Sequence, residues 1–317
     1  MYSYFFLDGY KARSWYHFGP GGGLVIATDY RRCLRSVGNR RESMMQKFSW
    51  MLFVLLTFSV YAEDEKLLVV GSAQELKGIT AKKIIWKKDE AKMVRIPYEV
   101  VTPAKTKPAV YDEFGDLVKE ETVIPEKIKR SPFYMDAYEV TIGQFKKFLK
   151  SSGYKPDNAI DWNEVYEYSP TEKHPMIYVS WHDATAYAKW AGKRLPTEKE
   201  WEIAARGGLK NKRYPWGDDE SLARDNANYA GTGGKDKWNK TTARVGRFKP
   251  NGYGLFDMAG NVQEWCQDRY SSDQESRVLR GGYWGSDTDY LRVANRNINS
   301  PDNGSFSYGF RCVSGSN

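Results

Sequence analysis

The part of the chain after Gly208 limits most strongly what it can fold into, because few of its segments suit long helices or strands. The stretches YPWGDD, NANYAGTGG and KPNGYGLFDMAGNVQEW repeat glycine and asparagine, which accept the positive φ angles that tight turns need. The 317-residue chain also contains 28 Gly, 22 Tyr and 11 Trp, so aromatic rings must fill much of its core. This composition predicts a compact fold with many irregular connections.

Three short amphipathic segments before Gly208 predict helices. They cover residues 141–153, 180–192 and 197–207; each starts with Thr or Ser, which can cap a helix, and ends with Gly, which can stop one. A Pro- and Lys-rich connection follows the first of the expected strands. Alternating or β-branched apolar residues predict strands at 93–101, 131–141, 278–284, 291–295 and 309–313. The expected fold class is therefore α+β, with little regular secondary structure.

The formal net charge of +8 does not indicate a nucleic-acid partner. Much of the excess comes from Lys and Arg within the first 47 residues, and elsewhere basic residues alternate with Asp and Glu. That pattern is typical of a solvated surface rather than of a basic stripe that follows a phosphate backbone. We therefore expect no nucleic-acid partner.

Residues 45–62 have the pattern of a signal peptide: a lysine, an apolar run from Trp50 to Val60, and Val-Tyr-Ala before acidic residues. The apolar run is shorter than the ~20 residues that span a bilayer, so we expect no transmembrane span in the mature form. Residues 1–44 are then interpreted as an extension from a misassigned start codon. These features predict export to the periplasm or the cell surface of a bacterium.

Residues 63–92 are charged and poor in turn signals, and are interpreted as an N-terminal arm before a domain at 93–313. Five motifs follow one another in that domain: RLPTEKEWEIAARGG, YPWGDD, NGYGLFDMAGNVQEW, RVLRGGYW and GFRCV. In this order and at these intervals they resemble the formylglycine-generating-enzyme family, the sulfatase-modifying factors. The resemblance implies an irregular α+β fold of the C-type lectin type.

The enzymes of this family oxidise a sulfatase cysteine with copper held by two cysteines after the RGG motif. Soft thiolates are the ligands that select Cu(I). The matching segment here, Gly281 to Arg296, contains no cysteine. The resemblance places Cys312 at the family's structural GFRC position and Ala205 where its disulfide partner usually stands. We therefore expect a protein without catalytic residues that is not an enzyme.

The other cysteines and the histidines do not restore a catalytic site. Cys33 lies in the expected extension, which leaves Cys266 and Cys312, and the sequence leaves open whether these two pair. The iron-dependent sulfoxide synthases of this family add a histidine-rich domain. This chain has three histidines, His17, His174 and His182, without a nearby carboxylate-histidine motif, so they are interpreted as ordinary core or surface residues.

Members of the family often bind calcium near a GNVWEW-like loop, and oxygen ligands suit this hard cation. Gln263 stands where the family usually has Trp. The alternative is a structural turn with a hydrogen-bonded Glu264. No cofactor is required, and calcium is a candidate structural ion. Its candidate ligands are Asn228, Gly260, Asn261, Val262 and Glu264.

Residues 278–313 also resemble the variable proteins of diversity-generating retroelements, which display a hypervariable ligand surface on this fold. Random bases at the first two places of an asparagine codon cannot encode Lys, Glu, Gln, Met or Trp, and the fourteen positions between the fixed frame residues contain none of these. They are the candidate ligand-binding residues Tyr283, Gly285, Ser286, Asp287, Thr288, Asp289, Tyr290, Ile298, Ser300, Gly304, Ser305, Phe306, Ser307 and Tyr308.

The composition of these positions supports the same hypothesis on physical grounds. Tyr and Phe supply rigid contact area, while Ser, Gly and Asp adapt their hydrogen bonds, as in an antibody paratope. The frame residues Trp284, Leu291, Val293, Phe310 and Val313 are expected to pack inward. The sequence favours a ligand-binding protein with an unknown protein or surface ligand as partner; a formylglycine-generating-type oxidase and a fixed-function structural envelope component are the alternatives.

Overall fold

The computed structural model describes the backbone of residues 3–7, 10–18 and 24–28, and of residues 67–315 with short gaps at 103–104, 109, 112–116, 120–121, 125–126, 232–237, 239 and 273. The chain divides into two compact units, residues 1–66 and 67–317. The first contains an antiparallel meander of β1 (Ser3–Leu7), β2 (Tyr10–Phe18) and β3 (Leu24–Thr28). The expected signal peptide, residues 45–62, lies outside the described residues. Among the described residues, no helix is long and apolar enough to cross a membrane.

A five-stranded sheet forms one half of the second unit, in the order β18-β13-β6-β5-β4. The strand β4 pairs in parallel with β5, and the other neighbours are antiparallel. Because β18 comes from the end of the chain, this sheet joins the two ends of the domain. The strands are β4 (Leu68–Val70), β5 (Lys83–Trp86), β6 (Lys92–Ile96), β13 (Phe133–Asp136) and β18 (Val313–Ser314).

Residues 67–92, expected as an arm outside the domain, belong to this sheet. The short helix η1 (Gln74–Leu76) connects β4 to β5. The side chains of Ile84 and Trp86 are fully buried, and Trp86 Nε1 donates to the carbonyl of Ala191 at 2.7 Å. The folded domain therefore begins before Met93, the start that the sequence predicted. The strand β5 was not predicted because lysines flank its few apolar residues in the sequence.

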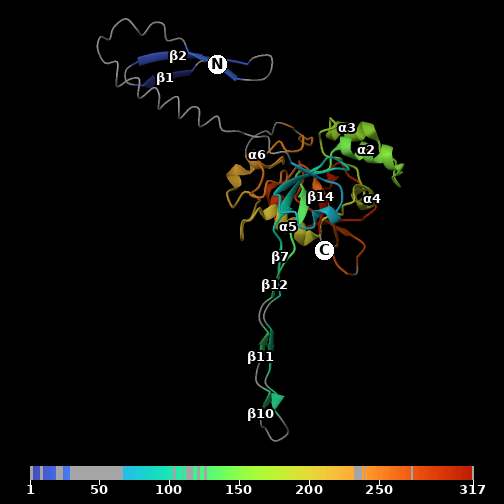
Figure 1. Cartoon of the computed structure of the whole chain (residues 1–317). Coiled ribbons are helices and arrows are strands. Elements are labelled where there is room, and N and C mark those ends of the chain that lie inside the picture. The colour runs from blue at the N-terminus through green and yellow to red at the C-terminus, as the bar shows by residue number, and fades with distance from the viewer. Residues whose placement is uncertain are drawn as a thin grey trace, which may run out of the picture. The chain divides into compact units, whose positions relative to one another are not determined.

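The Pro- and Lys-rich connection forms a two-stranded ribbon (Figure 1). Three successive antiparallel pairs build it, and the amide of Ser131 donates to the carbonyl of Tyr98 where it returns to the sheet. The pairs are β7 (Glu99–Thr102) with β12 (Lys127–Arg130), β8 (Lys105–Lys107) with β11 (Thr122–Ile124), and β9 (Val110–Tyr111) with β10 (Leu117–Lys119). The expected single strand at 93–101 is thus two strands, β6 and β7.

A four-stranded sheet in the order β16-β15-β14-β17 carries the C-terminal segment. Its strands β14 and β17 are parallel, and the other neighbours are antiparallel. Residues 263–265, expected as part of a loop, begin the longest of these strands. Residues 291–295, expected as a strand, form none: Leu291 ends the short helix η3 (Thr288–Leu291), and 292–295 follow it. The strands are β14 (Gln263–Arg269), β15 (Arg277–Arg280), β16 (Asn297–Asn299) and β17 (Tyr308–Gly309).

The three expected helices are confirmed as α2 (Ile142–Ser152), α4 (Trp181–Ala191) and α5 (Glu198–Arg206). Each begins with a capping box, and the glycine after each adopts the left-handed conformation, with φ between 57° and 72°. The sequence analysis missed α3 (Trp162–Tyr168), η2 (Glu220–Leu222) and α6 (Ala223–Asn226).

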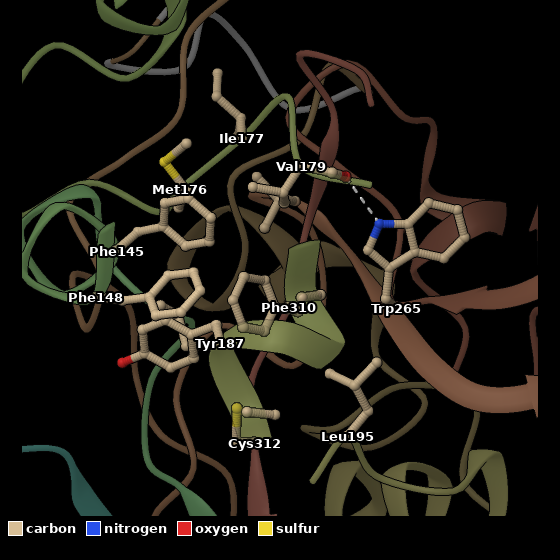
Figure 2. Close-up of a cluster of buried hydrophobic side chains, with 14 of the residues drawn as sticks. Phe145, Phe148, Met176, Ile177, Val179, Tyr187, Leu195, Trp265, Phe310 and Cys312 are labelled. Atoms are coloured by element: carbon tan, nitrogen blue, oxygen red, sulfur yellow. Dashed lines mark hydrogen bonds between the residues drawn. The ribbon is translucent and has the colours of Figure 1, made fainter. Parts of the chain in front are cut away.

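A cluster of aromatic side chains joins α2 and α4 to the second sheet (Figure 2). The rings of Phe145 and Phe148 lie 5.3 Å apart, and Tyr187 meets Phe310 at 5.3 Å. Trp265 Nε1 donates to the carbonyl of Val179 at 3.0 Å, as Figure 2 shows. Of the expected frame residues, Leu291, Val293, Phe310 and Val313 are buried, and Trp284 is half-buried.

Replacing Trp86 with alanine tests whether residues 67–92 belong to the core. We expect Trp86→Ala to lower the free energy of unfolding by about 3–5 kcal/mol, because it empties a fully buried site and removes the bond to Ala191. Urea unfolding followed by tryptophan fluorescence measures the change. Leu68→Ala, at a 46% exposed position, is the control. Equal, small effects of the two substitutions would contradict the assignment.

Candidate functional site

Two glycines set the direction of the first candidate segment after β15. Gly281 and Gly282 have φ angles of 96° and 73°, a region that side-chain-bearing residues rarely adopt. A Cβ atom on Gly281 would lie 3.1 Å from the Trp201 ring, and one on Gly282 would lie 3.0 Å from the carbonyl oxygen of Tyr290. The RGG motif therefore turns the chain sharply out of the sheet, and the segment 283–290 begins at this turn.

The structure brings the two candidate segments, 283–290 and 298–308, into contact. The rings of Tyr283 and Phe306 lie 6.0 Å apart, and those of Trp284 and Phe306 lie 5.6 Å apart. The strand β16 pairs with β15, which places Ile298 opposite Val278. The two segments thus meet at the rings of Tyr283, Trp284 and Phe306.

An aromatic residue outside both segments completes this region and was missed by the sequence analysis. Tyr168, at the end of α3, stacks on Phe306 at 5.3 Å and on Trp284 at 5.9 Å. A signal for α3 was present, because Asp161 precedes the apolar residues and its side chain accepts from the amide of Asn163. We call Tyr168, Tyr283, Trp284 and Phe306 the aromatic centre.

The fourteen candidate ligand-binding residues differ in exposure. Asp287, Asp289, Tyr290 and Gly304 are exposed, and Tyr290 is the most prominent apolar surface among them at 48%. Eight are half-buried: Tyr283, Gly285, Thr288, Ile298, Ser300, Ser305, Phe306 and Tyr308. Twelve of the fourteen therefore have surface to offer a ligand.

Ser286 and Ser307 are buried and make internal contacts instead. Ser286 Oγ accepts from the amide of Tyr283 at 3.0 Å, and its carbonyl accepts from the amide of Ala230. The carbonyl of Ser307 accepts from the amide of Gln263 at 2.8 Å. These two serines shape the turns that carry their neighbours, so the contact surface is smaller than the sequence suggested.

Gln263, at the position where Trp is usual, holds both ends of the second segment, 298–308. Its side-chain oxygen accepts from Asn297 Nδ2 at 2.9 Å, next to Ile298, and its amide holds Ser307. Gln263 is only 4% exposed. The side-chain oxygen accepts the bond from Asn297, which an indole, a donor only, cannot do, whereas the bond to Ser307 comes from the backbone amide.

Both described cysteines lie in the core of the domain. Cys266 and Cys312 are free, fully buried thiols, which answers the question of their pairing; Cys33 lies outside the described residues. Burial raises the pKa of both thiols well above the usual range. The thiolate form, which binds metals and attacks electrophiles, is therefore disfavoured at both sites.

His174 and His182 lie in different environments. His174 is buried, and its Nδ1 lies 2.8 Å from the hydroxyl of Thr171; burial lowers its pKa. His182 is exposed and its Nε2 lies 3.3 Å from Asp302 Oδ1. Over the described ranges, no group of three or more Asp, Glu, His or Cys side chains is placed to hold a metal ion.

Three of the five candidate calcium ligands, Asn228, Gly260 and Asn261, contact one another. Asn228 and Gly260 form an isolated parallel bridge, and the amide of Asn261 donates to the carbonyl of Asn228 at 2.9 Å. The Asn261 side chain donates to Glu139 Oε2 at 2.8 Å and accepts from the amide of Ala243 at 2.7 Å. Val262, the next residue, is fully buried. The loop is therefore well fixed by the protein's own hydrogen bonds.

Glu264 is fully engaged, as the alternative of a structural turn requires. Its two oxygens accept from the guanidinium of Arg311 at 2.7–2.9 Å, and Oε2 also accepts from Trp201 Nε1 at 2.8 Å. Asn228 Oδ1 and Asp257 Oδ1 are, by contrast, buried without a hydrogen-bond partner among the described residues. Burial raises the pKa of Asp257 to about 6. Oxygen atoms that could face a cation therefore remain beside the loop.

The family model of the sulfatase-modifying factor enzyme 1-like domain matches residues 87–315. The formylglycine-generating enzyme of Thermomonospora curvata is 36% identical over 59% of this chain and 83% of its own length. The inactive C-alpha-formylglycine-generating enzyme 2 of Bos taurus is 36% identical over 58% of this chain and 77% of its own length. The serine/threonine-protein kinase pkn1 of Chlamydia caviae is 39% identical over 58% of this chain, which spans only 33% of that relative.

Two solved structures confirm the expected fold class. PvdO from Pseudomonas aeruginosa superposes with a TM-score of 0.55 at 27% identity, over 74% of this chain and 98% of its own. Variable protein 1 of Treponema denticola gives 0.50 at 20% identity, over 74% and 99%. At 20% identity the second likeness concerns the fold alone, which is the C-type lectin-like α+β fold. Similar proteins thus include enzymes and a protein named inactive, so similarity does not fix catalysis.

Thiol labelling tests the buried state of the two cysteines. In a Cys33→Ser variant, we expect Cys266 and Cys312 to react with iodoacetamide at least about tenfold more slowly in the folded protein than in urea, because both are buried and held as thiols. Mass spectrometry after timed quenching gives both rates. Rapid labelling of either residue in the folded protein, or a disulfide between them, would be inconsistent with this site.

Proposed function

This chain belongs to the sulfatase-modifying factor enzyme 1-like family. We propose that it is a non-catalytic, exported ligand-binding protein with a variable C-terminal recognition surface. The observation that carries the proposal is the meeting of segments 283–290 and 298–308 around the aromatic centre. A recognition surface requires such convergence, because positions scattered over the molecule could not contact one ligand.

The division between exposed and buried positions supports the proposal. Asp287, Asp289 and Tyr290 are exposed and lie shortly before Leu291, which is fully buried. Substitutions at the first three positions change what a ligand meets, whereas the fourth holds the backbone. The same change from surface to core separates Gly304 from Phe310.

The aromatic centre gives the surface a fixed anchor. Tyr and Trp rings bury large areas at low entropic loss and dominate the binding energy of many interfaces. Tyr168 and Trp284 lie outside the fourteen candidate positions, so they would remain while Tyr283 and Phe306 change. We therefore infer that different versions of the surface keep the same two residues of the aromatic centre, Tyr168 and Trp284.

The non-catalytic part of the proposal follows from the sequence of the segment itself. Residues 281–296 hold no cysteine, and the thiols of Cys266 and Cys312 are buried elsewhere. Export rests on the signal-like residues 45–62. Formation of formylglycine by the copper-treated protein on a sulfatase-derived cysteine peptide would contradict the non-catalytic assignment.

Matched substitutions test the separation of surface from frame. We expect Tyr290→Ser to change the free energy of unfolding by less than about 0.5 kcal/mol, because the side chain is exposed. Leu291→Ser should cost at least about 2 kcal/mol, because that side chain is fully buried. Urea unfolding of both variants measures the difference. A large cost at Tyr290 would mean that this position belongs to the frame and is not free to vary.

We further propose that calcium can bind beside the loop Gly260–Val262. Asn228 Oδ1 and Asp257 Oδ1, both buried without partners among the described residues, would hold the ion together with backbone carbonyls of the loop. Three buried acidic side chains, Glu139, Asp257 and Glu264, lie around a single buried guanidinium, Arg311. Burial and the two neighbouring acids raise the pKa of Glu139 well above its usual range, so the site lacks a compensating cation. Bound calcium would supply the compensating charge and rigidity.

Thermal unfolding in calcium and in EDTA tests this site. Calcium should raise the Tm of the full chain, because an ion that binds only the folded state stabilises it. Asp257→Asn should reduce that increase, whereas Asp218→Asn, at an exposed site, should not. A Tm that is the same in calcium and in EDTA would rule out a structural calcium ion.

A further inference from the structure

A cavity of about 270 Å³ lies away from the recognition surface, between the turn that joins β5 to β6 and the start of α2. Its walls include Asp89, Asp136, Tyr138, Glu139 and Gln144. Glu90 and Lys92, which are exposed and carry opposite charges, line it as well. None of the fourteen candidate ligand-binding residues lines it. The cavity therefore requires an explanation separate from the proposed function.

The buried wall of this cavity carries more negative than positive charge. Asp89, Asp136 and Glu139 are only 2%, 2% and 1% exposed. One ammonium group, that of buried Lys193, lies 2.8 Å from Asp89 Oδ2 and 2.7 Å from Asp136 Oδ1. Lys193 thus serves both aspartates and contacts neither oxygen of Glu139 in the described structure.

The two aspartates have all the partners that their oxygens need. Asp89 also accepts from the hydroxyl of Tyr187 at 2.9 Å, and Asp136 accepts from the amide of Cys312 at 3.0 Å. Gln144 donates its side-chain amide to the carbonyl of Asp89 at 3.1 Å. These groups are therefore fixed parts of the wall rather than open binding groups.

Glu139 is different, because one of its oxygens has no partner. Oε2 accepts from Asn261 Nδ2 at 2.8 Å, whereas Oε1 is buried and has no hydrogen-bond partner among the described residues. A buried carboxylate oxygen without a partner is strongly unfavourable, so such an atom beside a cavity points to a missing donor. A donor that enters the cavity can supply this bond, and a cationic donor would also offset the acidic wall.

We propose that this cavity binds an organic cation, the ammonium or guanidinium group of an amine ligand, with Glu139 as its ion-pair partner. The volume is several times the ~30 Å³ that one water molecule occupies, so a charged group with a short carbon chain fits. The half-buried ring of Tyr138 lines the same cavity and can face a cation.

Binding of n-butylamine, compared with 1-butanol, tests the proposal on the full chain. The two probes have similar size, but at neutral pH only the amine is charged. Titration followed by NMR should show saturable binding of butylammonium in the millimolar range and at least about tenfold weaker binding of butanol. Equal binding of both probes would mean that the cavity selects for apolar volume, and no binding of the amine would overturn the proposal outright.

The substitution Glu139→Gln removes the charge and keeps an oxygen that can accept from Asn261. It should weaken butylammonium binding at least about tenfold, whereas Glu275→Gln, at an exposed position, should leave it unchanged. Near-ultraviolet circular dichroism shows whether each variant is folded. If Glu139→Gln does not fold, the comparison of butylammonium with butanol on the unsubstituted protein still tests whether the cavity selects a cation. If folded Glu139→Gln bound butylammonium with unchanged affinity, or if calcium displaced the amine, Glu139 would not be the ion-pair partner of an organic cation and the proposal would be wrong.

Discussion

The buried ion pair of Arg311 and Glu264 connects the parts of the domain on which the recognition surface depends. Both side chains are at most 1% exposed. Arg311 also donates to the carbonyls of Asp136 and Phe256, while Glu264 accepts from Trp201. One pair therefore joins β14 in the second sheet to β13 in the first and to α5. Losing one partner of such a pair costs about 3–5 kcal/mol, because the other charge stays buried.

The neighbours of Arg311 extend this connection in both directions. Phe310 enters the aromatic cluster with α2 and α4, and Val313 enters the cluster with Trp201 and the first sheet. Residues 310–313 therefore contact the helices α2 and α4, the strand β14 and the first sheet. A segment anchored in this way can carry exposed positions whose side chains change while the backbone stays in place.

The elements predicted correctly from the sequence are those that short-range signals determine. The helices α2, α4 and α5 were found because their caps and terminal glycines lie within a few residues of one another. The placement of residues 67–92 was not found, since β4 and β5 join a sheet completed by β18, from the far end of the chain. Tyr168 was missed for the same reason: its partners Trp284 and Phe306 come more than a hundred residues later. The burial of Ser286 and Ser307 depends on turns whose bonding partners, Ala230 and Gln263, are also distant.

The most direct test of the variable surface is the sequence of the 3′ end of the gene in many isolates, together with the neighbouring DNA. The account predicts differences that concentrate at the exposed and half-buried candidate positions, such as Asp287, Tyr290 and Gly304, with Leu291, Phe310 and Arg311 unchanged. An asparagine-codon-rich copy of the segment should lie nearby. Differences spread evenly along the domain, or an unchanging C-terminal segment without such a copy, would contradict it.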